Sequence, residues 1–167
     1  MADSAKDTLD RNYKMPETEG GTVVYNVDPL IVKYHYEMDY IHSYCQDSPW
    51  FHGLMNGKLL GSKCPKCGYV FATPRAHCMQ CGAKTEWMEL PKEGKVHTWT
   101  TCHFGSEEFL KETPYHLILV EFAVANTLLL SRLMGVPVGK VEIGMKVKAR
   151  FRRLSKIAPT DVYFVPA

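Results

Sequence analysis

Two short cysteine motifs constrain the fold of this chain more than any other feature of its sequence. The segments CPKCG and CMQCG occupy residues 64–68 and 78–82. Four thiolates in two CxxC pairs match the tetrahedral sulfur coordination of a single metal ion. The glycine after each pair permits the left-handed backbone that directs amide groups toward sulfur. The sequence therefore predicts a zinc ribbon with a structural zinc ion held by Cys64, Cys67, Cys78 and Cys81.

Paired cysteines also have other chemical roles, so there are alternatives to a zinc site. Two redox sites or two disulfides would also use CxxC pairs, but a redox CxxC usually opens a helix in a βαβ setting, and no such pattern surrounds either motif. Zinc is favoured over iron because the site is expected to be closed and structural, although four-sulfur geometry alone fits both metals. His77 adjoins Cys78 as a competing ligand, yet four cysteines already fill the coordination sphere.

The N-terminal residues bear on where the protein works. Residues 1–14 carry charges of both signs and lack the apolar core of a signal peptide. We therefore expect a cytoplasmic protein, in which metal binding is a more common role for paired cysteines than disulfide formation. No membrane contact is expected, since the longest uncharged apolar run, residues 122–131, falls far short of the roughly 20 residues that a spanning helix needs.

The first 62 residues are predicted to form a polar arm followed by helices. Residues 1–27 are expected to be an extended or mobile arm, with a short extended piece at residues 22–27. Asp28 and Pro29 suit a helix start, and an apolar stripe follows at helical spacing: Leu30, Tyr34, Met38, Ile41 and Cys45. Ser48-Pro49 begins a second helix, whose apolar side consists of Trp50, Phe51, Leu54 and Met55. Residues 28–62 are therefore predicted to be a helical segment, and their high aromatic content favours a docking role on a partner.

Beyond the ribbon, which is predicted at residues 63–91, apolar and polar residues alternate as they do in strands. The alternating stretches are residues 95–104, 116–125, 128–134, 145–153 and 161–165. Five antiparallel strands are enough for a small closed barrel of the OB type, which we predict for residues 92–167. A five-stranded sandwich fragment is the alternative. The expected fold class is mainly β, with an N-terminal helical segment, a rubredoxin-like zinc ribbon and an OB-type barrel.

The fourth of these stretches carries a row of cations. Residues 63–167 hold fifteen bases and nine acids, and four of the bases alternate with apolar residues: Lys146, Lys148, Arg150 and Arg152. On a strand, this spacing places the four cations on one face. The row is interpreted either as a solvated outer face or as a site for a polyanion, which would be nucleic-acid phosphates or the phosphates of a coenzyme A thioester.

The order of these motifs resembles the zinc-ribbon/OB-fold family of acyl-CoA-associated proteins, which act as thiolase-accessory proteins. The family's Pro-aromatic-x-Gly motif corresponds to Pro49–Gly53, and its Pro-Arg pair between the cysteine knuckles corresponds to Pro74-Arg75. The four cysteines and the barrel complete the match, which covers about residues 45–167. The resemblance implies a structural zinc ion held by the ribbon, and it leaves residues 1–44 unexplained.

The resemblance also implies a function. Members of this family are non-catalytic accessory subunits, so we expect a hetero-oligomer with a thiolase-like catalytic subunit and a coenzyme A thioester shared between the two chains. In that setting, the cations at residues 146–152 are the candidate ligands of coenzyme A phosphates. The alternative is an OB-fold module for single-stranded nucleic acid, with stacking by Trp99, Phe104, Tyr115 and Phe151. An independent small enzyme is a third hypothesis.

Overall fold

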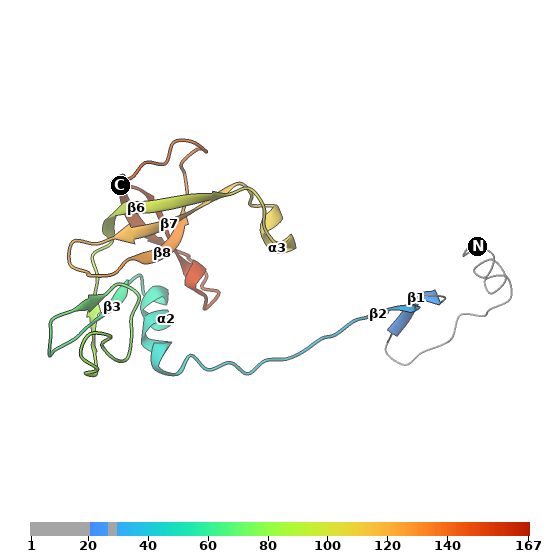
Figure 1. The fold of residues 1–167 in the computed structure, drawn as a ribbon, viewed down its shortest axis with the longest axis horizontal. Helices are drawn as coiled ribbons and strands as arrows, with labels where there is room; N and C mark the ends of the chain where they lie inside the picture. The colour runs from blue at the N-terminus through green and yellow to red at the C-terminus, as the bar shows by residue number, and fades with distance from the viewer. Residues whose placement is uncertain (1–20, 27–29) are drawn as a thin grey trace. The chain divides into compact units, whose positions relative to one another are not determined.

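The computed structural model describes residues 21–26 and 30–167, and the chain forms two compact units, residues 1–42 and 43–167. In the first unit, β1 (Gly21–Asn26) pairs with β2 (Leu30–Tyr34) in an antiparallel register that runs from Gly21 opposite Tyr34 to Asn26 opposite Leu30 (Figure 1). The extended piece expected at residues 22–27 is therefore present as far as Asn26. The rest of the predicted arm, residues 1–20 and 27, lies outside the described residues.

The prediction of a helix beginning at Asp28 is wrong over the described residues. Residues 30–34 form a strand, and residues 35–44 lie in neither a helix nor a strand (Figure 1). Asp28 and Pro29, the expected start, lie outside the described residues. Cys45, expected on the buried helix stripe, is exposed in the 3₁₀ helix η1 (Cys45–Asp47). The physical reason is that tyrosine and β-branched residues dominate this stretch and favour extended backbone.

The second predicted helix is present as α2 (Ser48–Met55), with Pro49 in its first turn. Trp50 and Leu54 are buried and Phe51 is half-buried, whereas Met55 is exposed. A three-stranded antiparallel sheet follows in the order β4-β3-β5, built from β3 (Leu60–Lys63), β4 (Val70–Phe71) and β5 (Glu86–Glu89). The cysteine motifs lie in the loops between these strands.

The remaining strands close into a barrel with the order β10-β8-β7-β6-β9, as expected for the OB type. Its strands are β6 (Glu93–Cys102), β7 (Tyr115–Glu121), β8 (Leu129–Leu133), β9 (Lys146–Phe151) and β10 (Val162–Pro166). Two short helices lie between them, α3 (Glu107–Leu110) and η2 (Pro159–Asp161). One detail of the prediction is wrong: β8 and β10 pair in parallel, because in this order the third and fifth strands run in the same direction.

The ribbon, α2 and the barrel share one hydrophobic core. Its members from outside the barrel are Trp50, Leu54, Leu59, Val70, Ala72 and Leu90, and they pack with barrel residues such as Val96, Ile118 and Phe164. Hydrogen bonds reinforce the junction, since the Val70 N–H donates to Asn126 Oδ1 at 2.8 Å and the Asn126 N–H donates to the Val70 carbonyl at 2.9 Å. Residues 43–167 are therefore one structural unit, in which the ribbon is part of the barrel's packing.

Candidate metal centre and basic strand

The structure brings the four predicted cysteines together. Their Sγ atoms all lie within 4.8 Å of one another, and two pairs, Cys64 with Cys81 and Cys67 with Cys78, are 3.5 Å apart. Zinc–sulfur bonds of about 2.3 Å place the corners of a tetrahedron about 3.8 Å apart, which matches this spacing. A disulfide needs a sulfur–sulfur distance of about 2.05 Å, and all four thiols are free. The geometry fits a four-sulfur metal site and contains no disulfide among these residues.

The two knuckles have the same local structure, because each is closed by the same pair of backbone hydrogen bonds. In each, the N–H of the glycine donates to the carbonyl of the first cysteine at 2.9 Å, and the N–H of that cysteine donates to the carbonyl five residues later at 2.8 Å. Gly68 and Gly82 have φ angles of +75° and +71°. This left-handed conformation suits glycine, which explains why CxxCG, rather than CxxC alone, recurs in the sequence.

Electrostatics indicate that the cluster needs a cation. The pKa of the Cys64 thiol is lowered to about 6, chiefly by a hydrogen bond from the backbone N–H of Cys67. Hydrogen bonds with the neighbouring thiols lower it further. The backbone N–H of Tyr69 acts to lower the pKa of Cys67, but burial and the neighbouring thiols outweigh it and raise that pKa to about 12. Thiolates this close repel one another, and a bound cation would offset their charge.

The surroundings of the cluster hold the second knuckle in place. The Arg75 N–H donates to the buried Ser62 hydroxyl at 2.9 Å, which ties the Pro-Arg pair to β3. His77 is exposed and forms a β-bridge with Lys84 at the base of the second knuckle. Among the described residues, the group that could hold a metal ion consists of the four cysteines without His77.

The predicted basic row is divided by the fold. Within β9, Val147 and Ala149 face the core, while Lys146 and Arg150 are exposed and Lys148 is half-buried. The register places Lys148 opposite Glu93 of β6 and Lys146 opposite Lys95. Arg152 lies beyond the end of β9, with its Nε 3.8 Å from Asp161 Oδ1. Three of the four predicted cations therefore share the strand, and the fourth is paired with a buried carboxylate.

Two cavities lie at opposite ends of this row. The first, of about 250 Å³, is lined by Lys146 and Lys95 together with Glu93 and Glu121. The second, of about 530 Å³, is lined by Arg152 and Arg132 together with Glu112, Tyr115 and His116. Each cavity combines two cations with at least one acid, so neither is a purely cationic site. The predicted cations therefore do not converge on one cavity.

Arg132 lines the second cavity, and the sequence did not single it out. Its guanidinium lies over the Tyr115 ring, 4.7 Å from the centroid, and forms an ion pair with Glu112. The hydrogen bond from Arg132 holds the pKa of the Glu112 carboxyl below its usual range. The neighbouring His116 is buried, with Nδ1 3.0 Å from the Thr101 hydroxyl and Nε2 3.1 Å from the Val136 carbonyl. Since a carbonyl only accepts, Nε2 carries a proton and donates it to Val136.

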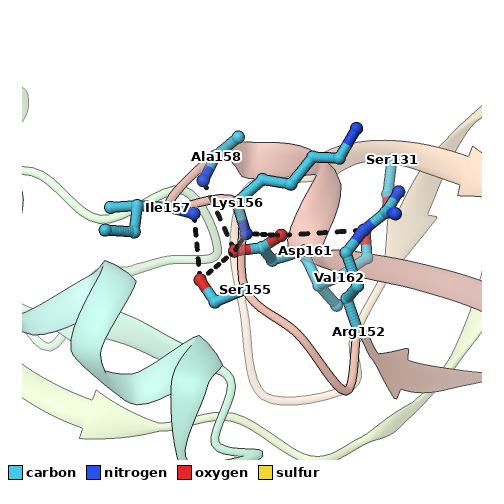
Figure 2. A network of polar contacts seen from close by, with 8 residues as sticks. All are labelled: Ser131, Arg152, Ser155, Lys156, Ile157, Ala158, Asp161 and Val162. Atoms are coloured by element: carbon cyan, nitrogen blue, oxygen red, sulfur yellow. Dashed lines mark hydrogen bonds and ion pairs between the residues drawn. The ribbon is translucent and has the colours of Figure 1, made fainter.

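Asp161 is a second residue that sequence reasoning missed. Its carboxylate is almost fully buried and accepts hydrogen bonds from the Ser155 hydroxyl at 2.5 Å, the Lys156 N–H at 2.9 Å and the Ala158 N–H at 3.4 Å (Figure 2). The same carboxylate pairs with Arg152. It therefore fixes the loop between β9 and β10, and with it one end of the basic row. Its loop partners lie only three to six residues before it, and Asp161 stands at the third position of η2, where its carboxylate accepts from the N–H of the N-cap residue Ala158.

Two known family domains match the second unit, one over the ribbon and one over the barrel. Residues 51–86 match the ChsH2 rubredoxin-like zinc ribbon domain, and residues 87–152 match the ChsH2 C-terminal OB-fold domain. The boundary between the two matches falls within β5, close to the end of the ribbon. These descriptions agree with the four-cysteine cluster and the closed barrel, and they confirm the predicted fold class.

Relatives with similar sequences include scaffold proteins of archaea. A DUF35 domain-containing scaffold protein of Methanocaldococcus jannaschii is 32% identical over 109 residues, which are 64% of this chain and 77% of the relative. Its counterpart in Methanothermobacter thermautotrophicus is 31% identical over 107 residues, or 63% of this chain and 80% of the relative. A probable enoyl-CoA hydratase alpha subunit of Thermomonospora curvata is 30% identical over 100 residues, which are 59% of this chain but only 30% of that protein.

Solved structures show the same fold. A chain described as "Ltp2-ChsH2(DUF35) aldolase" superposes with a TM-score of 0.61 at 25% identity, over 76% of this chain and 98% of the other. A DUF35 protein of unknown function from Sulfolobus solfataricus gives a TM-score of 0.55 at 24% identity, over 77% of this chain and 90% of the other. Within residues 21–26 and 30–167, no helix combines the length and apolar character that a membrane crossing requires. Since the alignments cover more than two thirds of both scaffold relatives at over 30% identity, this chain belongs to the DUF35 family.

Proposed function

We propose that this chain is a non-catalytic, zinc-containing accessory subunit of a thiolase-type complex that acts on acyl-CoA thioesters. In this proposal the partner subunit breaks or forms the carbon–carbon bond, and this chain assists assembly and coenzyme A binding. The observation that carries the proposal is the likeness to the chain of the Ltp2-ChsH2(DUF35) aldolase, of which 98% is covered. The scaffold proteins and the enoyl-CoA hydratase subunit among the relatives support the same assignment.

The metal site has a structural role in this proposal. Cys64, Cys67, Cys78 and Cys81 hold one zinc ion, supported by the spacing of the four sulfurs and by the match to a rubredoxin-like zinc ribbon. With four thiolates bound, the ion has no open position for a substrate, so it serves to stabilise the ribbon. The ribbon in turn supplies Val70 and Leu90 to the core of the barrel.

Each segment of the chain has its own role in this proposal. We assign residues 63–91 to the ribbon, residues 92–167 to the barrel, residues 28–62 to partner docking and residues 1–27 to an arm. Large exposed side chains at Tyr36, Tyr40 and Ile41 support a docking role for part of this region. Trp50 and Leu54 are committed to the chain's own core instead. A cytoplasmic location stays a prediction.

Coenzyme A binding is assigned to the basic row. Lys146, Lys148 and Arg150 leave β9 on one side and are candidates to meet the phosphates, with Arg152 at the end of the row. Support comes from the exposure of Lys146 and Arg150 and from the absence of an acid opposite Arg150, whose partner on β10 is Tyr163. Lys148 is weaker, because Glu93 lies opposite it.

Purification of the complex tests the proposed function. The full chain, tagged at its C-terminus and expressed in its native host, is expected to co-purify with one major protein that mass spectrometry identifies as a thiolase-fold enzyme. The complex, and not the chain alone, is expected to cleave or form acyl-CoA thioesters. Because the resemblance extends to the small subunit of 2-benzoylsuccinyl-CoA thiolase, that thioester is a first substrate to assay. A chain that binds single-stranded DNA or RNA and no thiolase-fold enzyme would overturn the proposal in favour of a nucleic-acid module.

The coenzyme A assignment has its own test within that complex. We expect Lys146→Ala combined with Arg150→Ala to raise the KM for the acyl-CoA substrate about tenfold or more, because each charge-assisted phosphate contact contributes about 1.5–3 kcal/mol. The kcat should stay constant, since groups remote from the reacting carbon stabilise ground and transition states alike. The matched control is Lys140→Ala, which removes an exposed cation from a loop. An unchanged KM in the double variant would show that the row is a solvated face.

A further inference from the structure

The cavity of about 530 Å³ beside β7 and β8 has a charged part and an apolar part. Its charged lining residues are Arg132, Arg152 and Glu112. Most of its apolar lining comes from the end of β8 and the segment after it: Leu133, Val136, Pro137 and Val138. A cavity with an apolar lining and a few converging polar groups is the usual form of a small-molecule site. Of these residues, only Arg152 has a role in the proposed function.

Arg132 is held in a fixed orientation at the wall of this cavity. Ser131 and Leu133 on either side of it are buried in the barrel, so the Arg132 side chain leaves β8 on the outer face. There its guanidinium lies over the Tyr115 ring, and only 19% of the side chain is exposed. Its Nε is buried, and no described residue accepts a hydrogen bond from it. The guanidinium is therefore positioned in advance and has unused capacity to donate.

The acid that pairs with Arg132 is much more accessible than the arginine. The Glu112 side chain is 52% exposed and belongs to the short segment between α3 and β7. The hydrogen bond from Arg132 lowers the pKa of the Glu112 carboxyl most, and the charges of Arg152 and Lys156 lower it further. The position of this carboxylate therefore suits an anion. An ion pair with an exposed member contributes little to stability, so Glu112 is an occupant that another carboxylate can replace.

Arg152 brings a second cation to the same cavity. Figure 2 shows that it approaches Asp161 through Nε, while its two terminal nitrogens point away from that carboxylate. The distance from Nε to Asp161 Oδ1 is 3.8 Å, which is longer than a hydrogen bond. Arg152 therefore keeps donors for another acceptor. The lining carries two cations and one acid, an excess of one positive charge that a monoanion would neutralise.

We propose that this cavity binds a small organic acid with an apolar body, whose carboxylate replaces that of Glu112 on Arg132. Arginine binds a carboxylate through two parallel hydrogen bonds, and the apolar body would lie against Leu133, Val136 and Pro137. Glu112 is then a built-in competitor that turns to solvent when the acid binds. Free phosphate fits less well, because it would leave the apolar part of the cavity uncovered. The site lies within this chain, so the inference goes beyond the proposed function and needs no catalytic partner.

Titration of the full chain with 2-naphthoate tests the site directly. The signal is the side-chain Nε–H resonance of Arg132 in the nitrogen-15 NMR spectrum, identified by its absence from Arg132→Lys. We expect 2-naphthoate to shift it with a dissociation constant on the order of 1 mM or tighter. Its neutral counterpart, 2-naphthamide, should bind about tenfold or more weakly, because it lacks the charge. Equal binding of acid and amide, no shift with either, or tighter binding of inorganic phosphate would overturn the inference.

Replacing Glu112 tests the displacement, because removing a residue from the site should then strengthen binding. We expect Glu112→Gln to bind 2-naphthoate about twofold to fivefold more tightly than the wild type, since the ligand no longer has to displace an acid. The matched control is Glu107→Gln, which removes an exposed acid of α3 that does not line the cavity and should leave the affinity unchanged. An affinity that does not rise in Glu112→Gln, or that rises equally in both variants, would overturn the inference.

A pair of neighbouring arginines tests whether the charge comes from the cavity. Arg152→Gln is expected to weaken 2-naphthoate binding about threefold or more, whereas Arg153→Gln, which removes an exposed arginine outside the lining, should have no effect. Equal affinities in the two variants would overturn the assignment to this cavity. The unfolding midpoint of each variant shows whether it folds, because Arg152 also pairs with Asp161. Glu112→Gln changes an exposed side chain, so it keeps the test decisive if Arg152→Gln fails to fold.

Discussion

Asp161 is a buried carboxylate whose hydrogen bonds fix the loop between β9 and β10. Burial acts to raise the pKa of the Asp161 carboxyl, but hydrogen bonds from the Ser155 hydroxyl and the N–H groups of Lys156 and Ala158 outweigh it and hold that pKa below its ordinary value. Folding therefore favours the ionised form. A group with a lowered folded pKa stabilises the protein above its unfolded pKa, and this stabilisation is lost as pH falls through the folded pKa.

Replacing this carboxylate should destabilise the fold in a pH-dependent manner. We expect Asp161→Asn to lower the free energy of unfolding by about 2–3 kcal/mol near neutral pH, since hydrogen bonds to a charged acceptor are lost. The difference from the wild type should shrink as pH falls below about 4, where the unfolded carboxyl takes up a proton, and it should be lost once the pH has passed through the lower folded pKa. Denaturant unfolding across this range measures the effect. The control is Glu142→Gln, an exposed acid on a loop. A difference that stays constant with pH would show that packing, and not charge, accounts for the loss.

At the scale of elements, the spacing of residues predicted those features whose parts are close together in the sequence. The cysteine knuckles and the five barrel strands were predictable because a tetrahedral site and a half-buried strand each impose a short period on the sequence. The parallel pairing of β8 with β10 was not, since it depends on the order in which distant strands close the barrel. The Arg132 ion pair was missed for the same reason, because Arg132 and Glu112 meet only in three dimensions. Asp161 is different, since Ser155, Lys156 and Ala158 precede it by only three to six residues.

The mistaken helix shows where periodicity fails. Leu30, Tyr34, Met38 and Ile41 fit helical spacing, and the same stretch also fits strand spacing through Val32, Tyr36 and Tyr40. Large apolar residues at most even positions satisfy both periods, so spacing alone does not choose between them. The aromatic and β-branched content favours the strand, and the hairpin with β1 realises it as far as Tyr34.

At the scale of the whole molecule, the ribbon and the barrel share one hydrophobic core. Trp50, Val70 and Leu90 pack in the same core as Val96 and Phe164. Burying one such side chain contributes about 1.5–3 kcal/mol. If the ribbon loses its shape, these residues leave the core and the barrel loses one side of its packing. The metal ion should therefore stabilise the whole of residues 43–167 and not only the loops that bind it.

Removal of the metal should lower the stability of the entire second unit in one cooperative step. We expect metal analysis of the full chain to find about one zinc ion per chain, and Cys78→Ser to lose it and to unfold at a markedly lower temperature, because structural zinc supplies folding energy directly. Circular dichroism of the strands and tryptophan fluorescence, to which the buried Trp50 contributes, should report the same midpoint, since both depend on the shared core. The matched control is Cys45→Ser, which replaces an exposed thiol outside the cluster and should keep both metal and midpoint. Two separate transitions, with the barrel unaffected by metal loss, would show that the ribbon and the barrel are stabilised independently.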